Sequence, residues 1–268
     1  MKRKVASTLP LLAAVCLLAL AFPSPAPAQR QGNKASQSNK ATTKSNTQPA
    51  TKPAPKADVT LSATAAPRVD VVTPSASFLS PLEKEILDEM NLARTEPQKY
   101  AAFVEEYKKY YDGNRLMIPG RKKALVTNDG VAAVDEAIKF LRAQQPLPAF
   151  EVSKGVSSAA ADHAKDLATS GINGHKGSDG SLPNARVDRY GRWEGAIGET
   201  LVYELSPARQ VIIALIIDDG VPTRGHRRNI FDPNYKITGI SVSDPLSFGS
   251  KCVIDYVGGF KEKAPSTK

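Results

Sequence analysis

The sequence is poor in cysteine and histidine, with two of the first and three of the second in 268 residues. Cys16 lies in residues 1–28, which have the features of a cleaved signal peptide, so Cys252 is the single cysteine of the mature chain. This excludes an intramolecular disulfide there, and stability has to come from core packing or from a bound ion. Cys252 opens the apolar run Cys252-Val253-Ile254, which predicts a buried, unreactive thiol.

The sequence also lacks a run of about 20 apolar residues, the length that a helix needs to cross a bilayer. Its N-terminal apolar run covers only residues 9–22, after three basic residues at 2–4 and before Ala26-Pro27-Ala28. This order is typical of a secretory signal peptide cleaved near Gln29, and it predicts export without a membrane span in the mature chain. A retained N-terminal anchor is the alternative.

Residues 29–78 contain almost no large apolar side chains, so they cannot bury enough surface to offset the entropy of ordering, and we predict a disordered linker. The formal net charge of the chain is +9, but residues 79–260 hold 23 Lys and Arg against 24 Asp and Glu, a net of −1. The positive excess therefore lies in the signal peptide, the linker and a flexible tail at 261–268. A folded domain with this nearly neutral net charge gives no electrostatic support for nucleic-acid binding. The linker is predicted to be a solvated spacer, with contact to an anionic envelope polymer as the alternative.

Residues 79–260 are enough for one domain with a sizeable core, and no internal repeats divide them. Helices are predicted where apolar residues recur at helical spacing, with Ser80 and Asn128-Asp129 as caps and Gly171 as a stop. The expected helices cover residues 81–94, 97–104, 131–141, 153–170, 183–189 and 206–217, and the expected strands cover 196–205, 237–242 and 252–257. Helices on both sides of three late strands predict an α/β fold, a three-layer α/β/α sandwich with a small, mainly antiparallel central sheet.

Some conspicuous side chains have a structural and a functional interpretation. The tyrosines at 107, 110 and 111 could form a binding edge, but packing against the neighbouring helix is the more ordinary explanation. His163 lies among alanines of a predicted helix, where a hydrogen-bonded structural role is expected. Arg227-Arg228 could bind an anion, although solvation at the surface is the default expectation for adjacent arginines.

Several motifs occur in a set order along residues 79–260 and concentrate between 175 and 234. They are Asn91-Leu92-Ala93-Arg94, Asp162-His163-Ala164, the loop 174–180, Gly198-Glu199-Thr200, and the segment 225–230 followed by Asp232-Pro233-Asn234. In order and spacing they resemble the bacterial branch of the CAP superfamily, named for cysteine-rich secretory proteins, antigen 5 and pathogenesis-related 1 proteins and also called the SCP domain. The resemblance covers about residues 79–260.

The resemblance implies a central cleft lined by two histidines and two acidic residues, which in some members binds a divalent metal. His175, Glu199 and His226 match three of these positions, and Asp218, on the helix before the second histidine, is taken as the fourth. Two imidazoles with carboxylates suit Zn²⁺, Ni²⁺ or Mn²⁺, and Zn²⁺ is expected first. The sequence lacks the disulfides and the histidine-tyrosine-threonine turn of the eukaryotic branch, so the sterol or lipid binding of some relatives is not carried over.

Three interpretations of this site are open. The leading hypothesis is a secreted, non-catalytic binding module, extracellular, periplasmic or associated with the cell envelope, that holds a divalent ion and recognises an envelope component or a partner protein. The second is that two His–Glu pairs form a hydrogen-bonded network that fixes the loops to the sheet and binds nothing. The third is a secreted metal-dependent hydrolase, although the sequence has no H-E-x-x-H motif and nothing marks Ser178, for which loop capping is expected, as a nucleophile.

Overall fold

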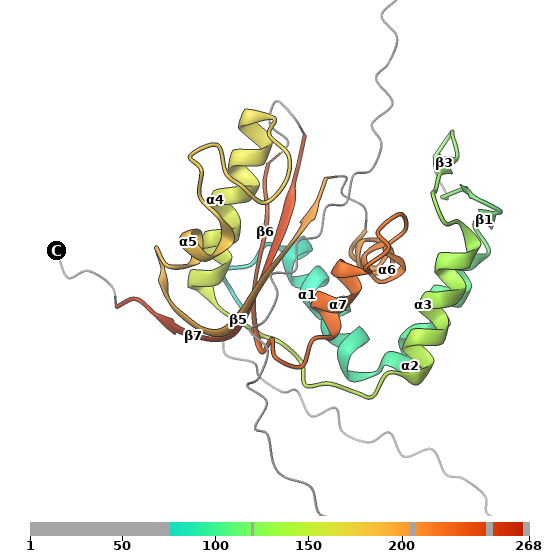
Figure 1. Cartoon of the computed structure of the whole chain (residues 1–268), viewed down its shortest axis with the longest axis horizontal. Coiled ribbons are helices and arrows are strands. Elements are labelled where there is room, and N and C mark those ends of the chain that lie inside the picture. The colour runs from blue at the N-terminus through green and yellow to red at the C-terminus, as the bar shows by residue number, and fades with distance from the viewer. Residues whose placement is uncertain (1–75, 119–120, 204–206, 245–248, 265–268) are drawn as a thin grey trace, which may run out of the picture. The chain divides into compact units, whose positions relative to one another are not determined.

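A computed structural model describes residues 76–118, 121–203, 207–244 and 249–264 of the chain (Figure 1). The predicted signal peptide, nearly all of the predicted linker and the end of the predicted tail lie outside the described residues. Within the described part, no helix has both the length and the apolar character needed to cross a membrane.

A four-stranded sheet in the order β4-β6-β7-β5 forms the centre of the domain. The strands are β4 (Glu151–Val152), β5 (Gly191–Val202), β6 (Ile237–Val242) and β7 (Cys252–Glu262). β7 runs antiparallel to both β5 and β6, and the short β4 is parallel to β6. The three long strands are those expected from the sequence, so the small and mainly antiparallel sheet is confirmed.

β5 begins earlier than expected, at Gly191 instead of residue 196. Its first residues pair with 259–262 of β7, and the register then shifts at a bulge between Glu194 and Ile197. Gly195, with a φ of 77°, lies in this bulge. The glycines made this segment look like a connection, but a bulge interrupts the alternation of side chains without ending the pairing of the strands.

Helices cover both faces of the sheet, as Figure 1 shows. One face carries α4 (Lys154–Ser170) and α5 (Pro183–Val187), and the other carries α1 (Pro81–Thr95), α6 (Ala208–Ile217) and α7 (Gly225–Phe231). The expected three-layer α/β/α sandwich is therefore confirmed. Next to α6, α3 (Val131–Ala143) packs against α2 (Pro97–Lys108). Between α2 and α3 the chain forms a small antiparallel sheet from β1 (Tyr111–Asp112), β2 (Arg115–Leu116) and β3 (Leu125–Val126).

The tyrosines beside this small sheet pack on one another. The ring of Tyr107 meets those of Tyr110 and Tyr111 edge to face, with centroid distances of 5.7 and 6.1 Å. Tyr107 is buried, and the other two are partly buried against the core. These contacts support the packing interpretation of the three tyrosines.

Two of the predicted helix boundaries are confirmed by local hydrogen bonds. Ser80 and Glu83 form a reciprocal capping box at the start of α1, and Gly171 ends α4 with a φ of 70°. The Glu83 carboxylate also accepts a hydrogen bond from the backbone N–H of Val242 at 2.7 Å. The cap of α1 therefore also attaches this helix to the end of β6.

The predicted cap of α3 is wrong. Gly130 is the N-cap residue, and no side chain of Asn128 or Asp129 caps the helix. Instead the carboxylate of Asp219 accepts hydrogen bonds from the backbone N–H groups of residues 128, 129 and 130 at 2.7, 2.8 and 3.1 Å. Asp129 in turn accepts a hydrogen bond from Gly220 N–H at 3.0 Å. The acceptor lies about 90 residues later in the chain, so a local pattern could not reveal it.

The apolar core lies mainly between the sheet and α1, α2, α3 and α6, and smaller clusters lie beneath α4. Cys252 is fully buried in the main cluster, which confirms the predicted buried thiol. α4 approaches the sheet very closely, since a Cβ at Gly239 of β6 would lie 2.2 Å from the carbonyl carbon of Val156. This contact fixes α4 over β6 and thereby sets the position of the loop that follows α4.

The buried Arg94 of α1 holds the chain around the end of α7. Its guanidinium donates to the carbonyl oxygens of Ile230 at 2.5 Å and Tyr235 at 3.3 Å, and its Nε donates to Pro148 at 2.8 Å. It also lies 3.8 Å from the ring centroid of Phe150. Burial lowers the pKa of Arg94 to about 10, so the group stays charged at neutral pH.

Candidate functional site

The first imidazole–carboxylate pair joins the loop after α4 to strand β5. Nδ1 of His175 in this loop is 2.7 Å from Oε1 of Glu199 in β5. Arg186 of α5 donates from Nη2 to the other carboxylate oxygen at 2.6 Å and to the His175 carbonyl oxygen at 3.1 Å. All three side chains are buried. The carboxylate therefore orients the imidazole, and the guanidinium holds both the carboxylate and the loop.

The pKa of the Glu199 carboxyl reflects opposing effects. Burial by itself would raise it, because a carboxylate loses solvation in the protein interior. The hydrogen bond from His175 and the charge of Arg186 outweigh burial, and the pKa of Glu199 lies below its usual value. Glu199 is therefore an anion at neutral pH, stabilised by partners on two other segments.

His163, the third histidine, lies beside this pair on α4. Its Nε2 is 3.0 Å from the carbonyl oxygen of Gly174 and 4.0 Å from Oε1 of Glu199. Because a carbonyl oxygen only accepts, Nε2 carries the proton in this contact. Burial lowers the pKa of His163, which favours the neutral ring. The expected hydrogen-bonded structural role is confirmed, and the bond attaches the His175 loop to α4.

The second pair lies at the junction of α6 and α7. Asp218 follows the last residue of α6 with a φ of 54°, a left-handed conformation that aspartate tolerates better than most residues. Its Oδ1 is 2.6 Å from Nδ1 of His226, and its Oδ2 accepts from the His226 backbone N–H at 2.8 Å. Both side chains are fully buried. Asp218 thus fixes the ring of His226 and the first turn of α7 together.

After Gly225 we expected a turn with two exposed arginines, but the structure has the helix α7 there and buries one of the arginines. Residues 225–231 are helical, and Arg227 is only 4% exposed. Its Nε donates to the carbonyl oxygen of Ile216 at 2.5 Å, and its Nη1 donates to Glu136 of α3 at 2.8 Å. Surface solvation is therefore the wrong prediction for Arg227, because its guanidinium satisfies a carbonyl at the end of α6. Arg228 is exposed, as expected.

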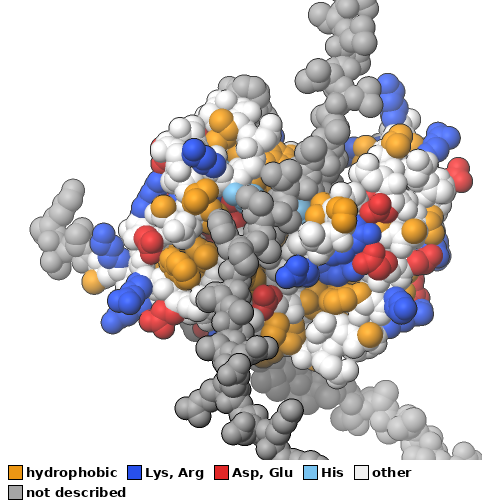
Figure 2. Space-filling view, in the orientation of Figure 1, with side chains coloured by type: hydrophobic (Ala, Val, Ile, Leu, Met, Phe, Trp, Pro, Cys, Tyr) orange, Lys and Arg blue, Asp and Glu red, His pale blue; other side chains and the backbone are white. Residues whose placement is uncertain are grey.

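Asn229 of α7 connects the two pairs. Its Nδ2 donates to the carbonyl oxygen of Glu199 and to Oγ1 of Thr200, each at 3.2 Å. The helix that carries His226 is thus attached to the strand that carries Glu199. The structure places the four predicted site residues as two buried pairs on segments joined in this way. Figure 2 shows histidine atoms in only small areas of one face, in line with this burial.

These hydrogen bonds determine which atoms could bind a metal ion. In both histidines Nδ1 faces a carboxylate, so Nε2 is the nitrogen suited to coordination. Nε2 of His226 is buried and has no hydrogen-bond partner among the described residues. Across the described residues, no three His, Cys, Asp or Glu side chains come together as a metal-binding group. Imidazoles oriented by carboxylates are chemically suited to bind a metal ion, and coordination by His175, His226, Glu199 or Asp218 stays a prediction.

Asp255 is a residue of this site that the sequence analysis missed. It is fully buried in β7, directly opposite Glu199 in the register of β5 and β7. No donor group among the described residues gives either of its oxygens a hydrogen bond. Burial raises the pKa of Asp255 well above its usual range, and the nearby Glu199 carboxylate raises it further. An ionisable residue inside the apolar run 252–257 was the available signal, because such residues are rarely buried without a specific role.

Ser178 in the His175 loop donates hydrogen bonds to an acid of α4. Its hydroxyl donates to Oδ1 of Asp166 at 2.6 Å, and its backbone N–H donates to Oδ2 of the same residue at 2.7 Å. These bonds attach the loop to α4 through Asp166, and capping of the loop by the Ser178 hydroxyl stays a prediction.

One family model matches this chain. Residues 136–253 match the cysteine-rich secretory protein family, CAP. The matched segment runs from α3 into β7, so it contains all three histidines, Glu199 and Asp218, and it ends two residues before Asp255. No curated protein matches the sequence.

Two solved structures are similar to part of this chain. One is an extracellular protein containing a SCP domain from Bacillus anthracis, with 16% identity and a TM-score of 0.35 over 41% of this chain and 34% of that chain. The other is an outer surface protein from Borrelia burgdorferi, with 17% identity and a TM-score of 0.36 over 44% of this chain and 80% of that chain. The match thus spans about a third of the Bacillus anthracis protein.

Proposed function

We propose that this chain, whose residues 136–253 match the cysteine-rich secretory protein family, is a secreted, non-catalytic binding module. Its two imidazole–carboxylate pairs hold a divalent ion and recognise a component of the cell envelope or a partner protein. The observation that carries this proposal is the buried His226 ring, with Nδ1 fixed by Asp218 and Nε2 without a partner among the described residues. A buried nitrogen in that position is costly unless something binds it.

Zn²⁺ is the ion that we expect first, because imidazoles suit it and carboxylates that orient imidazoles are common around zinc. His175 and His226 would be its ligands, and Glu199 and Asp218 would orient them. When bound, the ion would supply an electrophilic centre with open positions for an oxygen of the recognised molecule. Two protein ligands are fewer than most zinc sites have, so we expect weak binding that the recognised molecule strengthens.

Covalent catalysis by a serine or a cysteine is not supported by the state of Ser178 and Cys252. The hydroxyl of Ser178, three residues after His175, donates to Asp166. Cys252 is fully buried in the core, and burial raises the pKa of its thiol well above the usual range. A nucleophile has to be accessible, and Cys252 is not. Ser178 is exposed and faces the Asp166 carboxylate. Burial by itself would raise the pKa of Asp166, but the hydrogen bonds from Ser178 outweigh it, so this carboxylate is a weak base. Export is supported by the signal-peptide features of residues 1–28.

Co-sedimentation of residues 29–268 with isolated cell envelopes tests the proposal. We expect the protein to sediment with envelopes in the presence of Zn²⁺ and to be released by a chelator. His226→Ala should stay in the supernatant, whereas His163→Gln, which removes a histidine not proposed as a ligand, should sediment. Thermal melts establish that both variants are folded. Sedimentation that neither the chelator nor His226→Ala changes would contradict the role of the site, and no sedimentation would contradict an envelope component as the partner.

A further inference from the structure

The small sheet of β1, β2 and β3 has an inner and an outer face, and Figure 1 shows it at the end of the α2–α3 pair, away from the central sheet. The register pairs Arg115 with Asp112 on one side and with Val126 on the other, and all three are exposed. Residues opposite each other on neighbouring strands point to the same face, so these three form the outer face. Leu116 and Leu125 pair on the inner face and pack against the main core cluster.

The outer face carries exposed apolar side chains. Val126 is 77% exposed. Met117 is 47% exposed and donates its backbone N–H to the carbonyl oxygen of Tyr110 at 2.8 Å, which continues the pairing of β2 beyond its last residue. Because side chains alternate along an extended strand, Met117 lies on the same side as Arg115. Among the residues that the structure describes, the other exposed large apolar side chains are Phe78 and Leu182.

The charge around these side chains is mainly positive. Residues 113–127 hold four Lys and Arg and no Asp or Glu, and Asp112 is the acid that precedes them. Lys122 and Lys123 are exposed, and Lys123 lies three residues before Val126, so the Cα atoms of these two are at most about 11 Å apart. Figure 2 shows basic and hydrophobic side chains next to one another at this end of the molecule. We call the following five residues the basic face: Arg115, Met117, Lys122, Lys123 and Val126.

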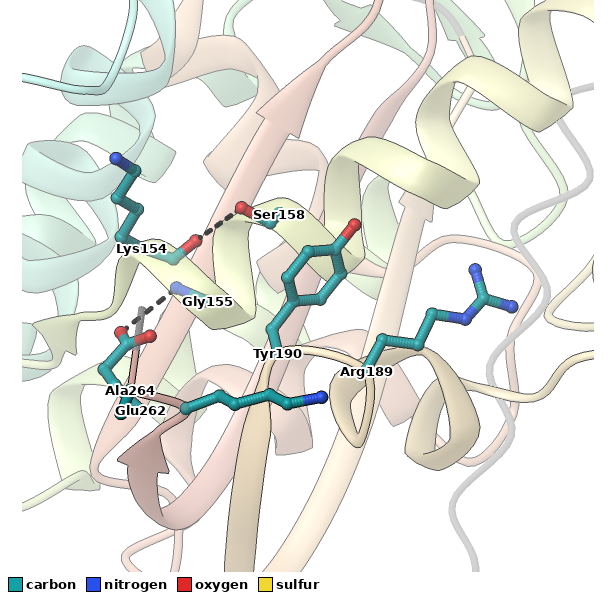
Figure 3. A pocket seen from close by; sticks show the side chains of 8 residues that line it. Lys154, Gly155, Ser158, Arg189, Tyr190, Glu262 and Ala264 are labelled. Carbon is teal, nitrogen blue, oxygen red and sulfur yellow. Dashed lines mark hydrogen bonds between the residues drawn. The ribbon is translucent and has the colours of Figure 1, made fainter. Parts of the chain in front are cut away.

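The open depression at the start of α4 has a different character (Figure 3). Arg189 at its edge pairs with Asp162 and Asp179 at 2.8 Å each. Oε1 of Glu262 accepts a hydrogen bond from the backbone N–H of Gly155 at 3.1 Å, which Figure 3 marks. Charges of both signs that are paired within the surface select no class of ligand, whereas the basic face combines one sign of charge with apolar side chains.

The charge of the basic face determines which occupant fits it. Residues 29–78 of this chain hold seven Lys and Arg against two Asp and Glu, a net of +5, so this segment is repelled. The same face of a second copy is repelled for the same reason. The partner is therefore anionic. A soluble polyanion offers no apolar phase to Met117 and Val126, but an anionic bilayer offers both charge and an apolar phase.

We propose that the basic face binds the surface of an anionic lipid bilayer. Arg115, Lys122 and Lys123 lie beside the headgroup phosphates, and Met117 and Val126 enter the interfacial region. Because few groups take part, the contact is weak, reversible and sensitive to salt. It therefore does not hold the protein on dilute envelopes after a chelator has removed the ion. The proposal does not rest on an ion at the imidazole pairs, and its test contains a chelator.

Sedimentation of residues 29–268 with sucrose-loaded vesicles, in EDTA and at about 1 mM lipid, tests this proposal. We expect binding to phosphatidylcholine vesicles with about 30% phosphatidylglycerol, less binding to phosphatidylcholine alone, and release by high salt. The double substitution Lys122→Gln and Lys123→Gln should lower the partition coefficient about tenfold or more, since each charge near an anionic surface contributes about fivefold. The basic segment 29–78 is present in every variant, so the differences between variants are decisive.

A second double substitution distinguishes a bilayer from a soluble polyanion. Met117→Gln with Val126→Thr keeps the charge and removes the apolar contact, so binding to anionic vesicles should weaken about fivefold or more. Binding of the same variant to polyphosphate in solution should equal that of the wild type. Vesicle binding that this variant leaves unchanged would assign the basic face to a soluble polyanion and overturn the proposal.

The matched control removes two exposed charges elsewhere. Lys236 lies just before β6 and Lys261 near the end of β7, so Lys236→Gln with Lys261→Gln should bind vesicles like the wild type. Thermal melts establish that every variant is folded. Failure of the wild type to sediment with anionic vesicles, or an equal loss of binding in both lysine variants, would overturn the proposal.

Discussion

Glu199 and Asp255 lie directly opposite each other on neighbouring strands, and both carboxyl groups are buried. Two carboxylates in such a position repel each other strongly in the protein interior. Glu199 has a lowered pKa and Asp255 a raised one, so the interior favours an anion at Glu199 and a proton on Asp255. The sheet beneath His175 therefore carries one charged and one neutral acid.

Replacing Asp255 with asparagine should stabilise the domain at neutral and higher pH. A raised pKa means that stability from the protonated Asp255 is present below the unfolded-state pKa and is lost as pH rises through the folded-state pKa. Asp255→Asn avoids this loss. The free energy of unfolding should therefore rise by on the order of 1 kcal/mol, because one pKa unit corresponds to about 1.4 kcal/mol. Urea unfolding from pH 4 to 8 measures the difference, which should grow with pH. A variant less stable than the wild type throughout would contradict a neutral Asp255.

Arg186 should contribute strongly to the stability of the domain, because its buried guanidinium neutralises the buried Glu199 carboxylate. Arg186→Met leaves the Glu199 anion buried without its guanidinium partner, and we expect a loss of about 3–5 kcal/mol in urea unfolding. Arg228→Met, an exposed arginine in α7, is the matched control and should change stability by less than about 0.5 kcal/mol. Similar losses in both variants would refute the role of Arg186.

The adjacent aspartates 218 and 219 should have separable effects. Asp218→Asn disturbs the carboxylate that orients His226, so Zn²⁺ affinity should fall about 10–100-fold in calorimetric titrations. Asp219→Asn weakens the bonds to the start of α3 and should cost about 1 kcal/mol of stability, without changing Zn²⁺ affinity. An equal drop in Zn²⁺ affinity in both variants would show that the effect of Asp218 is indirect.

Cys252 should react with a thiol reagent only when the domain unfolds. The side chain is fully buried, and burial raises the pKa of its thiol well above the usual range. At pH 8 we expect labelling to be slow in buffer and fast in urea, with a rate that follows the unfolded fraction. Rapid labelling of the folded protein would contradict the position of Cys252 in the core.

Features set by local sequence were predictable. Ser80 with Glu83 and the left-handed Gly171 act through hydrogen bonds or backbone geometry within a few residues, so their roles can be read from the sequence. The sandwich followed from the order of helical and strand patterns. For the site, the choice of His175, Glu199, His226 and Asp218 came from the family resemblance, and the structure shows which histidine pairs with which acid.

Features set by distant contacts were not predictable. Asp219 binds the turn that precedes α3, about 90 residues earlier in the chain. Arg227 is buried because Ile216 and Glu136 accept its hydrogen bonds. Asp255 joins the site only because the register of β5 and β7 places it opposite Glu199. In each case the sequence near the residue does not contain its partner.

The most direct measurement is calorimetric titration of Zn²⁺ into metal-stripped residues 29–268, alone and with His175→Ala, His226→Ala or His163→Gln, at pH 7.5 and 5.5. We expect one ion per chain, lost in the first two variants and kept in the third. Binding should weaken at pH 5.5, because protons compete with the metal for imidazole ligands. Absence of binding by the folded wild-type protein, or unchanged binding in His226→Ala, would contradict a metal site at the imidazole pairs and leave them as a structural network.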